Sequence, residues 1–328
     1  MKSIAIFLIC SFLISCNPTT KELPINQKIV IAHRGASGYL PEHTLEAKAM
    51  AHAMNADYIE QDLVLSKDNI PMVIHDIYLD DITNVATKFP TRKRKDNRFY
   101  VIDFTFDELK ALQVTERFYP ANGEQVYKNR FPKGKGNFRL HSFKEEIDLI
   151  QGLNKSTGKN IGIYPEIKAP KFHQKEGKNL TKIVLKILSN YGYKTKKDNC
   201  ILQCFDAIEL EKIRKEFKSE LFLVQLIEFP EETKQLEHFA TYADGIGPWY
   251  KQILDEKIDD KFTFTSLVAD AHALNLKVHP YTLRADALDE FSTFDEMMET
   301  LLFDANVDGA FTDFPDKVLL FLQNEHSK

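Results

Sequence analysis

Cysteine is scarce in this chain of 328 residues, which contains four. None of them forms a C-x-x-C pair, so the sequence lacks the usual cysteine signatures of a redox motif or a zinc site. Cys200 and Cys204 lie four positions apart in the segment NCILQCFD. On a strand they would share one face without facing each other as a bridged pair does. We interpret them as small buried residues.

An excess of positive charge is also absent, since 43 Lys and Arg against 48 Asp and Glu give a net charge of −5. This balance provides no overall field that would attract nucleic acid or an anionic membrane, and we expect no nucleic-acid partner. The one dense basic run, RKRKDNR at 92–98, has two interpretations. It is either a solvated loop or a basic rim that attracts a phosphate-bearing substrate.

Long apolar runs are missing except near the N-terminus, where IAIFLICSFLIS follows Lys2. This run is too short to span a bilayer but has the length of the apolar part of a signal peptide. It ends in LISC, which resembles the lipobox of bacterial lipoproteins. We therefore expect a lipoprotein signal peptide at 1–15, a lipid on Cys16 and a tether at 16–27. The protein would be exported and anchored to a bacterial membrane, facing the periplasm or the cell surface; the alternative is an ordinary cleavage site near Cys16.

Several catalytic motifs are missing too. The sequence has no P-loop, no G-x-S-x-G elbow, no H-E-x-x-H pair and no G-x-G-x-x-G turn after a strand. Their absence disfavours P-loop nucleotide hydrolysis, serine hydrolysis of the α/β-hydrolase type, zinc proteolysis and dinucleotide binding.

What is present along residues 28–328 is an alternation of short apolar runs with segments of helical spacing. Continuous apolar runs are typical of parallel strands buried on both faces, and the alternation predicts one α/β domain, a TIM (β/α)₈ barrel. The link between Asp62 and His75 is too short for a helical crossover, so we expect a hairpin around SKDN. Nine runs are candidate strands, one more than such a barrel needs: KIVIAHRG, ADYIEQDLVL, IPMVIHD, NIGIYPEIKAP, CILQCFD, LFLVQLIE, YADGIGP, LKVHPYTLR and VDGAFTDFP.

Residues from about 80 to 142 interrupt this alternation. They are rich in Lys, Arg, Asn, Gly and aromatic residues and contain only a short helical stretch near FDELKAL. We predict that they form a subdomain inserted after the third strand, over the mouth of the barrel.

Three carboxylates, Glu60, Asp62 and Glu166, end predicted strands. Glu60 and Asp62 are two residues apart and therefore point to the same side of the sheet. Acids buried together need a cation or a proton to offset their repulsion. A hard divalent ion with oxygen ligands, Ca²⁺ or Mg²⁺, is one solution. The other is an ordinary network of ion pairs with Arg34 or Lys168.

Two histidines, His33 and His75, also end strands, and the carboxyl ends of barrel strands form the active-site face. A single histidine there is usually a structural hydrogen bonder, whereas two beside three acids indicate acid–base chemistry. With Arg34 and a metal to neutralise charge, this set suits transfer of a phosphoryl group. We interpret four other histidines as surface or core residues: His52, His173, His238 and His272.

These segments closely resemble the periplasmic, calcium-dependent class of bacterial glycerophosphodiester phosphodiesterases, from about residue 28 to about residue 320. The motifs that carry the resemblance are AHRGASGYLPEHTLEAKAMA, ADYIEQDLVLSKDN, VIHDIYLDDIT, GIYPEIKAP, VHPYT and FTDFPD. The resemblance implies a TIM barrel with an insertion after the strand that carries His75. It also implies hydrolysis of diesters such as glycerophosphocholine and glycerophosphoethanolamine to sn-glycerol 3-phosphate and an alcohol.

The same resemblance implies residue roles. His33 and His75 would be the acid–base pair, and the three acids would bind Ca²⁺ in preference to Mg²⁺. Arg34 would bind the phosphate, Glu42 would support the site and Lys168 would lie close to the metal-bound phosphate. The residues expected to bind the substrate, these three included, are Arg34, Glu42, Lys168, Gln203, Phe205, Gln225, Trp249, Tyr281 and Phe311. The stretch from LVQLIEFPEE to YADGIGPWY is shorter than in enteric members, which bears on head-group preference.

Two other functions remain open from the sequence. One is a phospholipase D-like or phosphoinositide-cleaving relative with the same barrel. The other is a surface protein that binds a host protein, because some lipoproteins of this family bind host immunoglobulin. Retention of every expected catalytic residue favours the enzyme, with or without an added binding role.

Overall fold

The structure is a computed structural model that describes residues 28–325. The expected signal peptide, the lipidated Cys16 and the tether lie outside the described residues. Within residues 28–325, none of the helices combines the length and the apolar character that crossing a bilayer requires.

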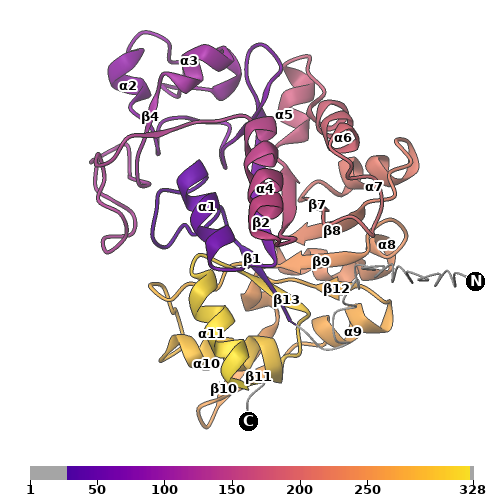
Figure 1. The fold of residues 1–328 in the computed structure, drawn as a ribbon. Coiled ribbons are helices and arrows are strands. Elements are labelled where there is room, and N and C mark those ends of the chain that lie inside the picture. The colour runs from indigo at the N-terminus through magenta and orange to yellow at the C-terminus, as the bar shows by residue number, and fades with distance from the viewer. Residues whose placement is uncertain (1–27, 326–328) are drawn as a thin grey trace, which may run out of the picture.

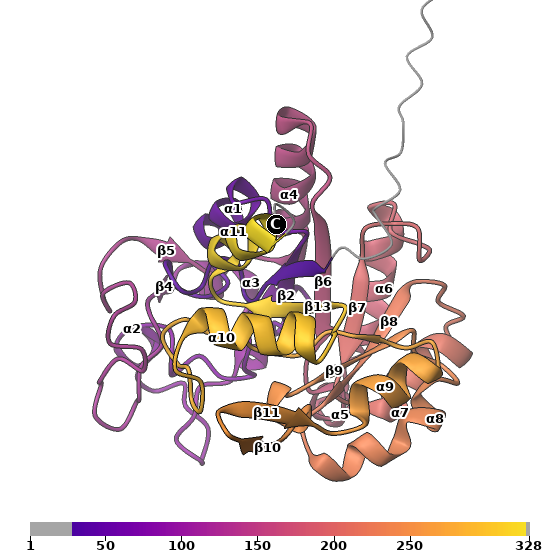
Figure 2. The same ribbon diagram turned by 90° about the horizontal axis from the view of Figure 1, so that it is seen from below.

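Eight parallel strands form a barrel, as the alternation of apolar runs predicts (Figures 1 and 2). Their order is β12-β9-β8-β7-β6-β2-β1-β13. Backbone hydrogen bonds from Asp308 N to Val278 O (2.9 Å) and from Leu283 N to Phe311 O (2.8 Å) join the two end strands. The strands are β1 (Ile29–Ala32), β2 (Tyr58–Leu65), β6 (Gly162–Ile167), β7 (Ile201–Cys204), β8 (Phe222–Ile227), β9 (Gly245–Pro248), β12 (Lys277–Val278) and β13 (Gly309–Thr312).

The ninth candidate strand, β3 (Pro71–Val73), pairs antiparallel with the second half of β2 and stays outside the barrel order. The expected hairpin is therefore confirmed. It explains why nine apolar runs fit a barrel of eight strands: β3 pairs with β2 but is not itself a barrel strand. Its consequence for the site is that His75, just after β3, reaches the mouth of the barrel beside the end of β2.

Helices cover the outside of the barrel, and several of them begin at a residue whose side chain caps the first turn. Helix α4 begins after Ser142, whose hydroxyl accepts from the backbone N of Glu145 while the Glu145 carboxylate accepts from the backbone N of Ser142. Such a reciprocal capping box satisfies backbone donors that would otherwise be unpaired. The covering helices are α1 (Leu45–Ala53), α4 (Phe143–Thr157), α5 (Pro170–Lys175), α6 (Leu180–Asn190), α7 (Ala207–Lys215), α8 (Leu236–Phe239), α9 (Leu267–Ala273), α10 (Phe294–Met298) and α11 (Pro315–Glu325).

Two apolar layers hold this architecture together. The larger lies between strands and helices, and it includes Leu63 of β2 and Ile147 of α4. The smaller fills the barrel with Ile31, Tyr164, Ile201, Val224 and Phe311, so the barrel is solid below its mouth. A packed interior of this kind leaves room for a site only at the carboxyl ends of the strands.

The segment between β3 and α4 packs around a separate set of buried apolar side chains, among them Leu79, Phe104 and Leu112. It lies at the upper left of Figure 1. The three arginines of the basic run are each paired with an acid: Arg92 with Glu108 at 2.8 Å, Arg94 with Asp103 at 2.7 Å and Arg98 with Asp80 at 3.0 Å. The pairing favours the solvated-loop interpretation of the basic run over a free basic rim. The segment contains α2 (Val85–Lys88), a 3₁₀ turn at Val101–Asp103, α3 (Phe106–Lys110), β4 (Gln113–Val114) and β5 (Phe138–Arg139).

Other elements were not expected from the sequence. After β9 come a 3₁₀ turn (Tyr250–Gln252) and a hairpin of β10 (Leu254–Ile258) and β11 (Lys261–Phe264). A further 3₁₀ helix covers Pro230–Gln235, and α10 continues into a π-helical turn at Glu299–Asp304. Cys200 and Cys204 are both buried and free, as predicted.

Candidate active site

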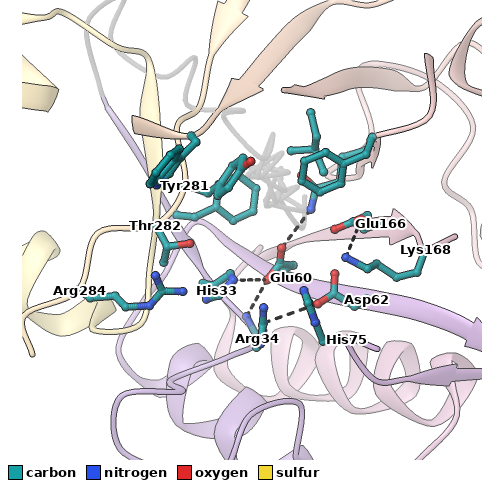
Figure 3. Close-up of a pocket in the computed structure, with 15 residues that line it drawn as sticks. His33, Arg34, Glu60, Asp62, His75, Glu166, Lys168, Tyr281, Thr282 and Arg284 are labelled. Carbon is teal, nitrogen blue, oxygen red and sulfur yellow. Dashed lines mark hydrogen bonds and ion pairs between the residues drawn. The ribbon is translucent and has the colours of Figure 1, made fainter. Parts of the chain in front are cut away.

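The predicted acids and histidines converge on one cavity of about 200 Å³ at the carboxyl ends of the strands (Figure 3). Glu60 and Asp62 come from β2, Glu166 from β6, and the two histidines follow β1 and β3. The cavity is lined by His33, Arg34, Glu60, Asp62, His75, Glu166, Lys168, Gln203, Phe205, Leu226, Trp249, Tyr281, Thr282, Arg284 and Phe311.

The three acids are almost fully buried and form the innermost part of this cavity. Glu60, Asp62 and Glu166 are 4%, 1% and 4% exposed, and one oxygen of each lies within 4.8 Å of the others. Burial and the neighbouring Asp62 raise the pKa of Glu60 to about 8, and burial raises the pKa of Glu166 well above its ordinary value. Burial would also raise the pKa of Asp62, but Lys168 and His43 hold it well below its ordinary value. Without a metal, Glu60 and Glu166 therefore tend to keep their protons, and a bound cation would displace them.

Two buried oxygen atoms support a cation site. Asp62 Oδ1 and Gln203 Oε1 have no hydrogen-bond partner, although each carries lone pairs that burial normally obliges a protein to satisfy. Gln203 Nε2 donates to Glu60 Oε1 at 3.1 Å, which fixes the amide beside the acids. An all-oxygen set of this kind fits a hard divalent cation. The ion-pair alternative holds in part, because Lys168 Nζ lies 2.9 Å from Glu166 Oε1 and Arg34 Nε 3.8 Å from Asp62 Oδ2.

His33 is oriented by a carboxylate at the far end of the chain. Its Nδ1 lies 2.5 Å from Asp313 Oδ1, and its Nε2 is directed toward Glu60 Oε2 at 3.9 Å. Burial would raise the pKa of Asp313, but Arg284, His33 and Arg130 hold it well below its ordinary value. The ionised Asp313 therefore accepts a hydrogen bond from Nδ1–H, and the Nε2 lone pair of His33 faces the cavity. Burial and Arg34 lower the pKa of His33 to about 4.

His75 has the same arrangement with a nearer partner. Its Nδ1 lies 2.9 Å from Asp76 Oδ1, and the other Asp76 oxygen accepts from Arg117 at 2.9 Å. Burial, Arg34 and Lys168 lower the pKa of His75 to about 4. Both histidines are thus neutral near pH 7, and each is oriented by an aspartate through Nδ1.

Arg34 contacts the acid cluster and lowers the pKa of both histidines, and the backbone is shaped to place it. Its φ of 58° lies in the left-handed region that only glycine adopts freely, and its backbone N donates to Glu60 Oε2 at 2.8 Å. Its guanidinium donates to both oxygens of Glu42, at 3.0 and 3.1 Å, while Nε is buried without a hydrogen-bond partner. An arginine held on one side and unsatisfied on the other is suited to binding an anion.

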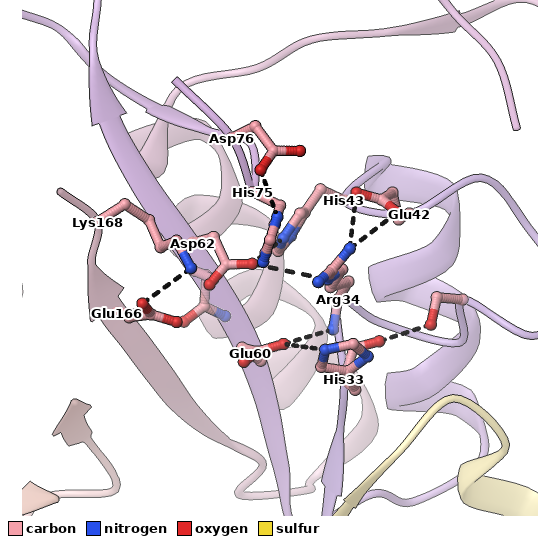
Figure 4. A network of polar contacts seen from close by, with 12 residues as sticks. His33, Arg34, Glu42, His43, Glu60, Asp62, His75, Asp76, Glu166 and Lys168 are labelled. Carbon is pink, nitrogen blue, oxygen red and sulfur yellow. Dashed lines mark hydrogen bonds and ion pairs between the residues drawn. The ribbon is translucent and has the colours of Figure 1, made fainter. Parts of the chain in front are cut away.

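A second set of buried polar groups lies behind Asp62 (Figure 4). His43 Nε2 is 2.7 Å from Asp62 Oδ2, and the ammonium of Lys48 is 3.1 Å from His43 Nδ1. Because Lys48 can only donate, His43 Nδ1 must accept and Nε2 must donate to Asp62. Lys48 also donates to the Glu60 carbonyl and pairs with Glu146 of α4 at 3.1 Å. This set fixes one oxygen of Asp62 and leaves Oδ1 to the site.

Most predicted pocket residues line the cavity, but two of the nine expected substrate contacts do not. Glu42 lies beside it, and its oxygens are taken by Arg34 and by Arg117 at 2.7 and 2.9 Å. Gln225 is directed outward from β8: its amide donates to the carbonyls of Phe205 (3.0 Å) and Leu226 (2.9 Å) and accepts from Tyr242. Side chains alternate along a strand, and Leu226 takes the position that faces the cavity.

Sequence reasoning missed several residues of the site. Thr282 and Arg284 line the cavity, and Arg284 Nε also donates to Asp313 at 2.8 Å. The signal for them was their place at the end of the run LKVHPYTLR. His43 and Lys48 gave no comparable signal, because one lies in a turn and the other on a helix with ordinary amphipathic spacing.

Fold and site together define an α/β-barrel enzyme with two aspartate-oriented histidines, a buried acid cluster and an anion-binding arginine. Residues 33–317 match the Glycerophosphoryl diester phosphodiesterase family. The chain is 45% identical to the glycerophosphodiester phosphodiesterase of Haemophilus influenzae, over 98% of this chain and 99% of that protein. It is 37% identical to the corresponding enzyme of Treponema pallidum, over 90% of this chain and 92% of that protein.

Solved structures agree on the fold. A structure from Silicibacter pomeroyi superposes with a TM-score of 0.70 at 22% identity, covering 92% of this chain and 95% of that one. An Oleispira antarctica phosphodiesterase in complex with the product sn-glycerol-3-phosphate gives a TM-score of 0.62 at 20% identity, covering 90% and 96%. The chain therefore belongs to the glycerophosphoryl diester phosphodiesterase family and is an enzyme that hydrolyses glycerophosphodiesters.

Proposed function

We propose that this enzyme converts glycerophosphodiesters such as glycerophosphocholine and glycerophosphoethanolamine to sn-glycerol 3-phosphate and the free alcohol, with Ca²⁺ at the acid cluster. The observation that carries the proposal is that Glu60, Asp62 and Glu166 share one cavity with Arg34 and both aspartate-oriented histidines. The Oleispira antarctica phosphodiesterase, with the same fold, binds sn-glycerol-3-phosphate, which supports the product.

The phosphodiester carries one negative charge, and two cations at the cavity would bind it. Arg34 directs an unsatisfied Nε toward the acids, and Lys168 lies on the opposite side of the cluster, paired with Glu166. In a cavity this buried, such charges act in a low dielectric and stabilise the additional negative charge of the transition state.

His33 and His75 would carry the protons. Both are neutral near pH 7, so one imidazole takes the proton of the attacking hydroxyl through Nε2. The departing alcohol oxygen needs a proton from an Nε2–H, so the other histidine would act in its protonated form, which the negative charge of the bound phosphodiester favours. It would give up this proton as the phosphorus–oxygen bond breaks, while the first imidazole keeps the proton taken from the attacking hydroxyl. The attacking hydroxyl is either the neighbouring glycerol hydroxyl, which gives a cyclic phosphate that water then opens, or water itself.

The acid cluster would hold the metal. Glu60, Asp62 and Glu166 would be its ligands, with the Gln203 Oε1 atom close by. Three carboxylates and an amide favour Ca²⁺, because Mg²⁺ keeps most of its water and usually takes one or two carboxylates. A bound divalent ion supplies positive charge to the phosphoryl oxygens.

The proposal includes export, with a lipid on Cys16 as the anchor and the barrel in the periplasm or at the cell surface. It is supported by the sequence around Cys16 alone. Cells that express the full chain and are fed a labelled fatty acid should label the protein, and Cys16→Ser should abolish the label. Unlabelled wild-type protein that is released in soluble form would contradict the anchor.

The activity is tested by release of sn-glycerol 3-phosphate from glycerophosphocholine, measured with Ca²⁺ and with EDTA. Wild type should turn over only with the metal. His33→Ala and Glu60→Ala should each lower kcat by at least about 10²-fold, as expected for loss of an acid–base group or a metal ligand. Turnover that is indifferent to EDTA would contradict the metal assignment, and activity retained by His33→Ala would contradict the acid–base assignment.

A further inference from the structure

A second cavity of about 630 Å³ opens beside the active site and continues from it. The two cavities share His75, Glu166, Lys168, Phe205 and Tyr281. The outer wall consists of residues 169–172 at the start of α5, Asp206 after β7 and Glu228 after β8. We call this cavity the side groove. Of the two site histidines, only His75 lines it, so the groove extends from the side of the site where His75 lies.

Aromatic side chains form much of the side groove, and they are held in place. Phe205 and Tyr281 meet edge to face, with ring centroids 5.9 Å apart and planes at 81°. The Tyr281 hydroxyl donates to the Ile227 carbonyl at 2.9 Å. Phe172 is stacked on Tyr100 at 5.6 Å. Such rings attract cations, and Lys168 Nζ already lies 5.6 Å from the centre of the Phe205 ring and the guanidinium carbon of Arg94 6.0 Å from that of Phe172. The Tyr281 ring has no such cation among residues 28–325 and is fixed at little entropic cost to a ligand.

The charges of the side groove do not balance. Lys168 pairs with Glu166, and Lys171 pairs with Asp206 at 2.9 Å. Glu228 has no ion-pair partner among residues 28–325, although its backbone is fixed by a hydrogen bond from its N to Glu232 Oε2 at 2.9 Å. Glu228 and Tyr281 both line the side groove, and the Glu228 charge adds to the rise in the pKa of Tyr281 that burial causes.

We propose that the side groove receives the alcohol half of the diester and selects an alcohol that carries an ammonium or quaternary ammonium group, through Glu228 and the rings of Phe172, Phe205 and Tyr281. This inference rests on the proposed function, since it assigns one half of that substrate. Arg34 and Lys168 would hold the phosphate beside the acid cluster. An ammonium group two carbons beyond the ester oxygen would then lie in the side groove, where Glu228 is the charged side chain without an ion-pair partner among residues 28–325. An uncharged polyol of similar length gains neither contribution.

The test compares kcat/KM for glycerophosphocholine, which is cationic in its alcohol, with kcat/KM for glycerophosphoglycerol, which is not. Wild type should prefer the choline ester, and Glu228→Gln should lower that preference about three- to tenfold, as expected for one partly screened charge and its cation. Glu228→Lys should lower it further. Glu231→Gln, an exposed acid outside the groove, is the matched control and should keep the wild-type ratio.

Salt provides a second readout that a structural effect would not produce. Raising the ionic strength should reduce the wild-type preference and leave the ratio of Glu228→Gln nearly constant. A ratio that is the same in wild type, Glu228→Gln and Glu228→Lys would overturn the side-groove assignment while the phosphodiesterase activity stands. Absence of turnover by Ca²⁺-loaded wild type on both substrates would instead overturn the proposed function.

Discussion

At the scale of single residues, the two glutamines expected at the pocket show that a residue's position along a strand decides whether its side chain faces the active site. Gln203 and Gln225 occur in similar apolar runs, yet one faces the acids and the other faces Tyr242. The inner positions of β8 are occupied by Val224 and Leu226, which puts Gln225 out of phase. The sequence predicts that neighbouring side chains of a strand point to opposite faces. Which of the two sets points into the barrel depends on the residues that fill it, and these are known only from the fold.

These two glutamines give a matched prediction. Gln203→Ala should weaken Ca²⁺ binding about 10- to 100-fold with little change in stability, because Gln203 positions a metal ligand. Gln225→Ala should leave the metal affinity near wild type and cost about 1–3 kcal/mol of unfolding free energy, because it leaves buried carbonyls and a hydroxyl unpaired. Calorimetric titration with Ca²⁺ and urea denaturation separate the two effects. Equal metal affinities in both variants would contradict the assignment of Gln203.

Glu60 supports a second prediction at this scale. Its raised pKa of about 8 means that at pH 7 the cluster without metal carries a proton there. Ligation requires the carboxylates, and burial raises the pKa of Glu166 as well, so Ca²⁺ binding at pH 7 should release at least about one proton, with the share from Glu60 falling as the pH rises above 8. Calorimetry in buffers of different ionisation enthalpy measures this number. A binding enthalpy that is independent of the buffer at pH 7 would show that Glu60 is already ionised.

At the scale of elements, α1 and α4 meet β2 through charges that are fully buried. Lys48 and Glu146 have no exposed side-chain area and lie 3.1 Å apart, and Glu146 also pairs with His141 at 2.7 Å. A buried ion pair adds little stability compared with two apolar side chains in the same place. Removing one partner, however, leaves the other charge buried and unpaired, which is costly. The pair therefore connects the position of α1 to that of α4, behind the metal ligands.

A double-mutant cycle tests this connection. Lys48→Met should cost about 3–5 kcal/mol, because it leaves Glu146 without its cation, and Glu146→Gln should cost a similar amount. The double variant should cost clearly less than the sum of the two, as measured by urea denaturation. Additive losses would mean that the two side chains act independently.

Elements also show why part of the fold was unpredictable. The nine apolar runs all became strands, because strands buried on both faces must be apolar throughout. The hairpin of β10 and β11 has no such signature, since only Leu254 in β10 is buried and its other residues are exposed. A strand that packs against little carries little hydrophobic pattern, and its existence depends on its partner.

At the scale of the whole molecule, buried neutral histidines make stability depend on pH. His279, directly after β12, is 3% exposed, and its Nδ1 is 3.0 Å from the Tyr164 hydroxyl. Burial lowers its pKa from 6.5 to about 4. The unfolded chain therefore binds more protons there between pH 6.5 and 4, so the contribution of His279 is complete above pH 6.5 and is lost as the pH falls toward 4.

His279→Gln should remove this dependence while keeping a group that can hydrogen bond to Tyr164. Between pH 6.5 and 4, wild type should lose up to about 3 kcal/mol more unfolding free energy than the variant loses. His238→Gln, at an exposed histidine, is the control and should follow wild type. Parallel curves for wild type and His279→Gln would show that folding does not lower the pKa of His279.

The whole molecule also limits how much of the site a sequence can reveal. The residues that end strands were predictable, because barrel topology gathers strand ends at one face. The side chains that hold these residues in place were not predictable. His43 lies in a turn, Lys48 on α1, and Arg117 and Arg130 in the segment between β3 and α4. Only the folded chain brings those elements together.

The contact between His33 and Asp313 joins residues separated by 280 positions. During synthesis the first strand leaves the ribosome long before the last one. Until β13 is made and closes the barrel, His33 has no carboxylate to hold its imidazole. A chain that stops short of Asp313 would carry both histidines and all three acids, but only His75, which Asp76 holds, would keep an oriented imidazole. The acid–base pair is therefore complete only after β13 has been made, and a product truncated before Asp313 is expected to lack activity.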